Sequence, residues 1–550
     1  MRIDYVYIEE FKNLKKVRID LDENQMNTVL LGQNATGKSN FLEALILIFK
    51  QLDLEEDPPQ GFKYEIQYQI RGISVNINYL DEKPKFEEIF GESITPISPF
   101  KISANRIISR PEFFRNKNKY LPKYIFTYYS GLSDRLDKLF WKHQQRFYSE
   151  IKKPDFDKTK LDDLRRLFYV KQIHSFFVLL AFFALPNIEK KTSDFLLKIL
   201  GIENLESVLF ILKEPSWAGK GDERFWGAEG LVKEFLSELW NFSMAPIYYK
   251  QTIYPDFRSK GIKQEQLYLY ITGKEKLHQF SKKYFKGLNI KPNNTDLFKA
   301  LESTYISELL EEVRVRVRKR VDGEVIFKEL SEGEQQLLTV IGLLIFTREE
   351  ESLVLLDEPD THLNPIWKYD YLHFLNTLVK SEGDSEEDQT TQIIINTHDP
   401  LVIGSMDKSQ VRIFQKNKET GHIDVIEPDV SPKGLGVAGI LTSELFGLPT
   451  ILDKDTQVKL NRKRYLQGRI MRDALDPNDY DEYHRLKAEL ENYGFYEEVE
   501  DQWFKMYLAE MSKHELMQKV EFTEEEKTIL QDESKNAVER VLEKLKKEQA

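Results

Sequence analysis

A glycine-rich loop near the start of the chain constrains the fold more than any other feature. Residues 32–39 read Gly-Gln-Asn-Ala-Thr-Gly-Lys-Ser and fit the phosphate-loop pattern G-x-x-x-x-G-K-[ST]. The apolar residues 26–31 precede the loop, and residues 41–49 continue as an apolar helix. Strand, loop and helix in this order place a helix N-terminus, with its partial positive charge, beneath bound phosphates. The sequence therefore predicts a nucleotide site on an α/β core.

Each part of the loop has an expected task. Backbone N–H groups wrap the phosphates, Lys38 reaches the β- and γ-phosphates, and the Ser39 hydroxyl holds Mg²⁺. The predicted phosphate cradle consists of Gly32, Gln33, Asn34, Ala35, Thr36, Gly37, Lys38, Ser39 and Asn40.

Composition limits the remaining possibilities. The 550 residues include 79 basic and 91 acidic side chains, a formal charge of −12, so the whole surface is not an obvious binder of polyanions. The absence of cysteine excludes disulfides, thiolate zinc sites and cysteine nucleophiles. No signal-peptide pattern opens the sequence, and its most apolar run, residues 176–185, is too short to span a bilayer. We expect a cytoplasmic protein without a membrane partner.

Changes in sequence character predict four regions. Residues 1–95 are strand-rich and contain the phosphate loop. Long helical patterns predict a mainly helical insertion over residues 96–300. Residues 301–430 return to alternating helix and strand as a second lobe of the α/β domain, and residues 431–550 form a charged, helical C-terminal region.

Three further motifs follow in a fixed order. Ser331 and Gly333 open an apolar helix, where free N–H groups favour an anion. An apolar strand ends in Asp357 and Glu358, which we expect to hold Mg²⁺ and to polarise the attacking water, respectively. Another buried strand presents His398, which can hydrogen-bond the γ-phosphate and that water. Each motif alone is common as a cap or a strand exit, but the ordered set predicts catalysis by Glu358 and His398.

This set resembles the ATP-binding-cassette (ABC) ATPases, in particular the SMC, Rad50 and RecF branch. Residues 32–39 match Walker A, residues 331–335 the signature motif, Asp357 and Glu358 the Walker B pair, and His398 the switch histidine. The resemblance implies an ABC-type ATPase head of the α/β class, with a helical insertion and a helical C-terminal region. It also implies ATP and Mg²⁺ as cofactors, with Ser39 and Asp357 on the metal.

The same resemblance implies a homodimer, because one chain carries a single copy of each motif. The signature residues of one chain would then face the ATP bound by the other. The further nucleotide contacts implied by the resemblance are Lys12, Asn13, Ser331, Gly333 and Glu334. Two departures leave the hydrolysis rate open: the Q-loop position in residues 125–131 has no glutamine, and Asn364 stands where many transporters carry aspartate.

Residues 128–136 and 434–449 narrow the resemblance to bacterial defence ATPases related to the overcoming-lysogenization group. Length and layout are similar to PtuA-type ATPases of Septu and retron anti-phage systems. Membership would imply an HNH nuclease partner (PtuB-like) and, in the retron version, a reverse transcriptase with its msDNA. Residues 473–501, with eleven acids and two bases, are a candidate docking segment for a basic partner.

Two alternatives remain open. A self-contained nuclease of the overcoming-lysogenization type would use Asp453 and Asp455, although the helical tail lacks the strands that such a site needs. A DNA-repair ATPase of the SMC or RecF type would bind DNA through the basic run 101–123, which has seven bases and one acid. The candidate nucleic-acid contacts are Arg106, Arg110, Arg115, Lys117 and Lys119.

Overall fold

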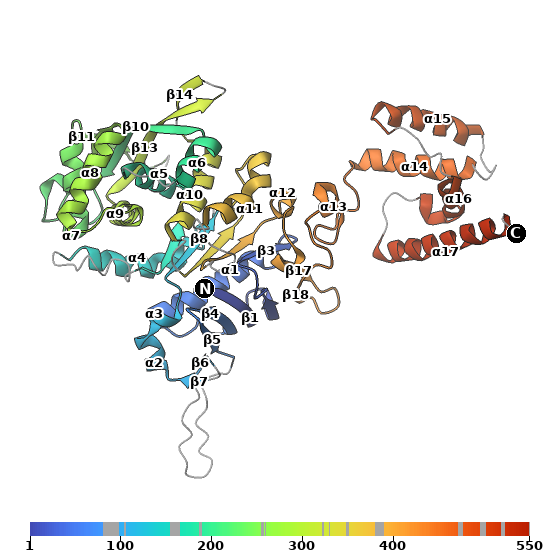
Figure 1. The fold of residues 1–550 in the computed structure, drawn as a ribbon, viewed down its shortest axis with the longest axis horizontal. Coiled ribbons are helices and arrows are strands. Elements are labelled where there is room, and N and C mark those ends of the chain that lie inside the picture. Colours follow the sequence, from blue (N-terminus) through green and yellow to red (C-terminus); the bar gives the residue numbers. More distant parts are fainter. Residues whose placement is uncertain are drawn as a thin grey trace, which may run out of the picture. The chain divides into compact units, whose positions relative to one another are not determined.

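The computed structural model divides the chain into two compact units, residues 1–440 with 444–446 and residues 441–443 with 447–550 (Figure 1). The structure describes residues 1–80, 98–103, 106–131, 133–153, 165–185, 190–254, 258, 260–321, 324–328, 330–347, 351–379, 390–470, 477–495, 502–518 and 523–548. The boundaries expected at residues 95, 300 and 430 stay a prediction. Within the described residues, no helix is long and apolar enough to cross a membrane.

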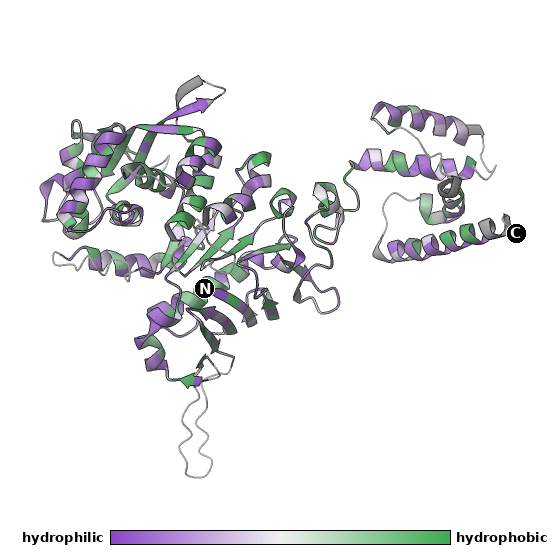
Figure 2. Ribbon diagram, viewed as in Figure 1, coloured by the Kyte–Doolittle hydropathy of each residue, from purple (hydrophilic) through white to green (hydrophobic). Residues whose placement is uncertain are grey.

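A seven-stranded sheet forms the centre of the first unit, and its strand order is β18-β17-β3-β16-β15-β8-β9. All neighbouring pairs are parallel except β17 and β18. The inner strands are buried on both faces, which explains their continuous apolar sequences (Figure 2). The strands are β3 (Asn27–Gly32), β8 (Tyr124–Tyr129), β9 (Leu167–Val170), β15 (Ser352–Asp357), β16 (Gln392–Asn396), β17 (Val411–Lys416) and β18 (Ile423–Ile426). The predicted α/β class is confirmed.

Helix α1 (Lys38–Leu54) follows the phosphate loop and joins the central sheet to a second, six-stranded sheet. Its residues Phe41, Leu45 and Ile48 are fully buried in one core with side chains of both sheets. Each such side chain stabilises the fold by about 1.5–3 kcal/mol. The second sheet has the order β2-β1-β4-β5-β6-β7 and consists of β1 (Arg2–Phe11), β2 (Leu14–Asp20), β4 (Lys63–Ile70), β5 (Ile73–Asn78), β6 (Phe100–Ile102) and β7 (Arg106–Ile108). Burial of α1 on both sides fixes the start of the helix beneath the loop.

The mainly helical insertion expected over residues 96–300 also contains strands. Strands β8 and β9 from this region belong to the central sheet, and another three join two later strands in a five-stranded sheet of order β11-β12-β10-β13-β14. These strands are β10 (Ile202–Lys213), β11 (Ile247–Ile253), β12 (Ile262–Thr272), β13 (Leu310–Val321) and β14 (Glu324–Lys328). The central strand β10 pairs with β13, about a hundred residues further along, so its local sequence gives little sign of the partner.

Helices surround these sheets (Figure 1). Those before β13 are α2 (Arg110–Arg115), α3 (Lys117–Tyr120), α4 (Asp137–Ile151), α5 (His174–Ala184), α6 (Lys190–Asp194), α7 (Gly230–Phe242), α8 (Gly273–Leu288) and α9 (Asn294–Ile306). Those after it are α10 (Glu332–Thr347), α11 (Pro365–Val379), α12 (Pro400–Ile403) and α13 (Gly436–Thr442). The second unit is helical and contains α14 (Lys454–Ile470), α15 (Pro477–Asn492), α16 (Gln502–Met511) and α17 (Glu524–Glu548).

Candidate functional site

The predicted motifs lie at one edge of the central sheet. Strands β3, β15, β16 and β8 are parallel and end at Gly32, Asp357, Asn396 and Tyr129. Because parallel strands direct their carboxyl ends to the same edge, residues far apart in sequence meet there. This edge contains the phosphate loop, the acid pair and the segment leading to His398.

Two glycines of the phosphate loop have no substitute. Gly32 has φ +138° and Gly37 has φ +98°, values that side-chain-bearing residues rarely adopt. A Cβ on Gly32 would lie 2.2 Å from the Phe414 carbonyl oxygen, and one on Gly37 would lie 2.7 Å from Leu14 Cδ2. The loop therefore needs glycine at both positions for its conformation and for close packing.

The Lys38 ammonium is held over this loop. It donates to the carbonyl oxygens of Gly32 at 2.7 Å and Gln33 at 3.1 Å. Burial lowers the pKa of Lys38, while the nearby Glu358 and Asp357 carboxylates oppose that shift. Thr36 Oγ1 donates to the Gln33 carbonyl at 2.8 Å and closes the turn. A cation above a ring of backbone groups is the arrangement that a polyphosphate needs.

The predicted Mg²⁺ ligands also meet. Ser39 Oγ lies 3.2 Å from Asp357 Oδ1, and Asn396 Nδ2 donates to both side chains. Asp357 Oδ2 is buried without a hydrogen-bond partner, and burial raises the pKa of this carboxyl. Among the described residues, no group of three or more His, Cys, Asp or Glu side chains is placed to hold a metal ion. A hydroxyl and a carboxylate with an unsatisfied oxygen suit Mg²⁺, which takes its other ligands from phosphates and water.

Glu358 and His398 form a pair beside this metal-ligand set. His398 Nε2 lies 2.9 Å from Glu358 Oε2, and this hydrogen bond raises the pKa of His398. Glu358 has φ +56°, the left-handed region that is strained for a side-chain-bearing residue. Its backbone N–H donates to the Asn396 carbonyl at 2.8 Å, and its own carbonyl accepts from Thr361 Oγ1 at 2.8 Å. The surrounding contacts thus hold the carboxylate in one direction.

The N-terminal contacts support the loop from outside. Asn13 Nδ2 donates to the Ala35 carbonyl at 2.9 Å, and Asn40 Nδ2 donates to Asn13 Oδ1 at 2.7 Å. Lys12 Nζ lies 2.6 Å from both carboxylate oxygens of Glu43, on the next turn of α1. Asn13 and Asn40 therefore brace the loop, and Lys12 is held within one helical turn of Ser39.

The signature residues occupy a different place. Ser331 N donates to Glu334 Oε2 at 2.8 Å and Glu334 N to Ser331 Oγ at 3.4 Å, a capping box at the start of α10. A Cβ on Gly333 would lie 2.6 Å from the His362 carbonyl oxygen, so this turn packs against the segment after the acid pair. The Glu334 carboxylate also pairs with Lys319 of β13, while Ser331 is exposed.

The candidate nucleic-acid contacts mostly pair with acids of the same chain. Arg106 lies 2.8 Å from Glu112, Arg110 lies 2.6 Å from Asp57, and Lys117 lies 3.0 Å from Glu55. Exposed ion pairs of this kind are weak, about 0–1 kcal/mol, so a nucleic acid can compete for them. Arg115 and Lys119 are exposed. Contact with nucleic acid stays a prediction for all five.

Asp453 and Asp455, the acids considered for a self-contained nuclease, make local contacts at the start of α14. Asp453 Oδ1 accepts from the Thr456 N–H at 2.9 Å at the start of α14, and Asp455 lies 2.6 Å from Lys459 one turn along that helix. A cap and an i,i+4 pair account for these two side chains.

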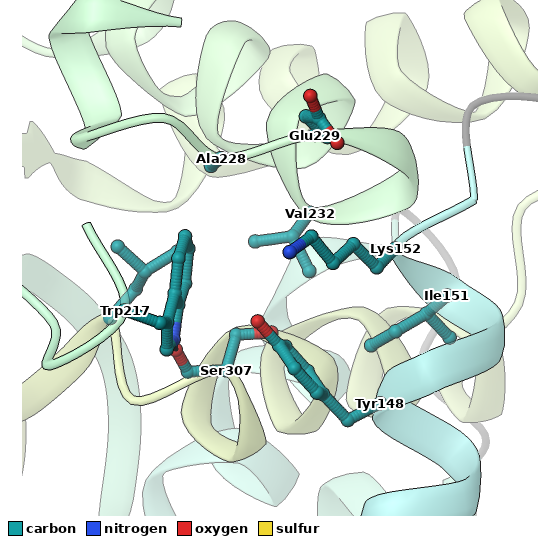
Figure 3. Close-up of a pocket in the computed structure, with 9 residues that line it drawn as sticks. Tyr148, Ile151, Lys152, Trp217, Ala228, Glu229, Val232 and Ser307 are labelled. Carbon is teal, nitrogen blue, oxygen red and sulfur yellow. Dashed lines mark hydrogen bonds between the residues drawn. The ribbon is translucent and has the colours of Figure 1, made fainter. Parts of the chain in front are cut away.

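A pocket elsewhere in the first unit lies between the ends of α4 and α9, the start of α7 and the segment after β10 (Figure 3). Trp217 Nε1 donates to the Ser307 carbonyl at 2.9 Å, and the Trp217 ring lies 6.1 Å from that of Tyr148. None of the predicted nucleotide-site residues lines this pocket.

Sequence reasoning missed three residues of the site. Asn396 bridges Ser39 and Asp357, and the only signal for it was an amide at the end of a buried strand. Ser130, in the expected Q-loop segment, donates its N–H to the Asp357 carbonyl at 3.2 Å, and its hydroxyl lies 3.0 Å from that of Thr361. Asp360 follows the acid pair and is buried, and burial raises its pKa to about 6.

Replacement of Asp360 with asparagine should stabilise the chain in a pH-dependent way. The pKa of the Asp360 carboxyl is higher in the folded chain than in the unfolded chain. The wild type therefore loses folding stability as the pH rises from the unfolded pKa to the folded value of about 6. The variant avoids this loss, and its advantage should grow by about 1 kcal/mol between about pH 5 and about pH 8. Urea unfolding without Mg²⁺ measures the difference. An advantage equal at both pH values would show that ionisation of Asp360 is not its source.

Comparison with known proteins places this site in a family. A family model described as AAA ATPase domain matches residues 1–403, which include every predicted nucleotide-site residue. The chain is 28% identical over 183 residues to the Septu protein PtuA of Bacillus mycoides (strain KBAB4), covering 30% of this chain and 24% of that protein. It is 32% identical over 117 residues to Protein ea59 of Escherichia phage lambda, covering 21% of this chain and 20% of that protein.

The two matches thus span less than a quarter of either relative's length. Among solved structures, an SMC head bound to the C-winged helix domain of ScpA has a TM-score of 0.32 at 13% identity, over 78% of this chain and 97% of that chain. The SMC head domain from Thermotoga maritima has a TM-score of 0.31 at 12% identity, over 78% of this chain and all of that chain (100%). The family match covers most of the sequence, and the chain belongs to the AAA ATPase domain family.

Proposed function

We propose that the chain hydrolyses ATP with Mg²⁺ at a site shared by two copies, and that it is the regulatory subunit of an anti-phage complex. The observation that carries the proposal is the convergence of Lys38, Ser39, Asp357, Glu358 and His398 at one sheet edge. The regulated enzyme is an HNH nuclease of the PtuB kind. In a retron version, a reverse transcriptase and its msDNA complete the complex.

The residues divide the work of hydrolysis. The loop N–H groups and Lys38 bind the phosphates, and Ser39 and Asp357 hold Mg²⁺, which would neutralise charge on the β- and γ-phosphates. Glu358 accepts a proton from the attacking water, and its hydrogen bond to His398 keeps the carboxylate directed at one place. His398 then donates to the γ-phosphate side of the site.

In the proposed dimer, a second copy supplies the remaining contacts of the nucleotide site. Ser331 is exposed at the N-terminus of α10, and such a terminus favours an anion. In that dimer, this serine, Gly333 and Glu334 face the ATP held by Lys38 of the other copy. ATP then acts as a clamp between copies, because either chain alone offers only half of the contacts.

The regulatory part of the proposal rests on the similarity to PtuA and on the second unit. Three acids of the expected docking segment are engaged within that unit: Arg462 lies 2.6 Å from Glu482, Lys459 lies 2.6 Å from Glu489, and Arg469 lies 2.5 Å from Asp479. They hold α14 to α15. Docking of a basic partner then falls to exposed acids such as Asp481. Residues 473–476 and 496–501 of the segment lie outside the described residues.

Co-expression with an HNH nuclease encoded beside this gene tests the regulatory role. The nuclease should co-purify with the wild-type chain, and its cleavage of DNA should change when Lys38→Ala removes ATP binding. Glu10→Gln, which alters an exposed carboxylate on β1, is a matched control and should behave as wild type. Regulation by ATP would be contradicted if the nuclease failed to co-purify, or if its DNA cleavage were the same with Lys38→Ala as with the wild-type chain.

A further inference from the structure

One carboxylate beside the phosphate loop is shared by two cations. Glu43 is buried on α1, one turn after Ser39, and both of its oxygens lie 2.6 Å from Lys12 Nζ. Arg135 approaches from another segment, with Nη1 4.0 Å from Glu43 Oε2. Lys12 already satisfies the carboxylate at hydrogen-bond distance, so Arg135 makes only a long contact with it.

One nitrogen of the Arg135 guanidinium lacks a hydrogen-bond partner in this conformation. This nitrogen, Nε, is buried, whereas the side chain as a whole retains 37% of its exposure. The guanidinium carbon lies 5.9 Å from the centre of the Tyr129 ring. A buried, unpaired guanidinium nitrogen costs free energy, so Arg135 gains by meeting an acceptor that Glu43 does not provide.

The location identifies that acceptor. Tyr129 ends β8 and is the register neighbour of Asp357 on β15. Tyr129, whose ring the guanidinium approaches, is followed by Ser130, whose backbone N–H donates to the Asp357 carbonyl at 3.2 Å. Arg135 also comes shortly after residues 125–131, the expected Q-loop segment, which contains no glutamine. The guanidinium thus lies beside the edge that the terminal phosphate of ATP would approach.

We propose that Arg135 leaves Glu43 when ATP binds and contacts the γ-phosphate, so that it distinguishes ATP from ADP. This inference rests on the proposed function, because it assigns one more ligand to the same site. Guanidinium matches a phosphate through two parallel N–H···O bonds, which a lysine ammonium cannot reproduce. Lys12 keeps Glu43 paired after Arg135 has moved, so the buried carboxylate is never left alone.

A movement of Arg135 can also be transmitted to other parts of the chain through helix α4. Helix α4 begins at Asp137, two residues after Arg135. It is tied to the far end of α1, where His143 Nε2 lies 3.1 Å from Asp53 Oδ2, and to the segment after that helix, where Lys142 lies 2.7 Å from Glu56. A shift of Arg135 toward the phosphate would therefore move the start of α4.

Nucleotide titration tests this role in the Glu358→Gln background, where hydrolysis does not interfere. Arg135→Ala should weaken the binding of Mg·ATP by about 10-fold or more and that of Mg·ADP by less than about 3-fold. Arg135→Lys should recover part of the ATP affinity and not all of it. Lys138→Ala is the matched control, since Lys138 lies on the same segment, is exposed and pairs with Asp134 at 3.0 Å.

A second variant separates phosphate contact from a purely structural pair. Glu43→Gln removes the competing carboxylate and should leave ATP binding equal to or tighter than in the background variant. Equal losses for ATP and ADP in Arg135→Ala, or a parallel loss in Glu43→Gln, would overturn the inference. Failure of the background variant itself to bind Mg·ATP would instead refute the proposed function.

Discussion

Replacement of Glu358 with glutamine is expected to stop ATP turnover while ATP binding persists. The carboxylate lies 2.9 Å from His398 and its backbone is held in a left-handed conformation by Asn396 and Thr361. Glutamine preserves the size and hydrogen bonding of the side chain but cannot accept the proton of the attacking water. Loss of a general base lowers kcat by about 100-fold or more. Release of inorganic phosphate at saturating ATP measures the effect.

Two controls separate chemistry from damage to the site. Mg·ATP should bind Glu358→Gln at least as tightly as the wild type, because the variant removes a negative charge from beside the phosphates. Glu10→Gln removes an exposed carboxylate with 64% of its side chain accessible and should hydrolyse ATP normally. Turnover by Glu358→Gln at the wild-type rate would show that another group takes the proton.

The second large effect is expected from Ser331→Arg. Ser331 is exposed at the start of α10, so arginine fits the isolated chain and costs about 1 kcal/mol through loss of the helix cap. In the proposed dimer the same side chain would push the partner's nucleotide site away. Turnover should fall by about 100-fold or more, since contacts that stabilise charge in the transition state are removed. ATP binding to the single chain should fall far less.

Ser149→Arg provides the matched comparison for Ser331→Arg. Ser149 is exposed on α4, and its hydroxyl donates to the Arg146 carbonyl within that helix at 2.8 Å. This control should keep wild-type turnover. If Ser331→Arg also kept it, each chain would complete its own site.

Local sequence was sufficient to predict the parts of the site that a single segment forms. The phosphate loop needs its glycines because of backbone angles and close packing, and these requirements are visible in the sequence as a short motif. Asp357 and Glu358 were identified because a strand of apolar residues ends in acids. Asn396 and Arg135 were not, since their roles depend on neighbours from distant strands. The five-stranded sheet was missed for the same reason, because β10 finds its partner β13 only in the folded chain.

Cross-linking between copies tests the central claim most directly. The sequence contains no cysteine, so introduced thiols are the only ones present. A chain with Asn34→Cys and Ser331→Cys in the Glu358→Gln background places one thiol on the phosphate loop and one at the start of α10. With a short bis-maleimide, ATP should produce a band of doubled mass on a denaturing gel, and either single cysteine should not. A doubled band that forms equally without ATP, or no band at all, would contradict an ATP site shared by two copies.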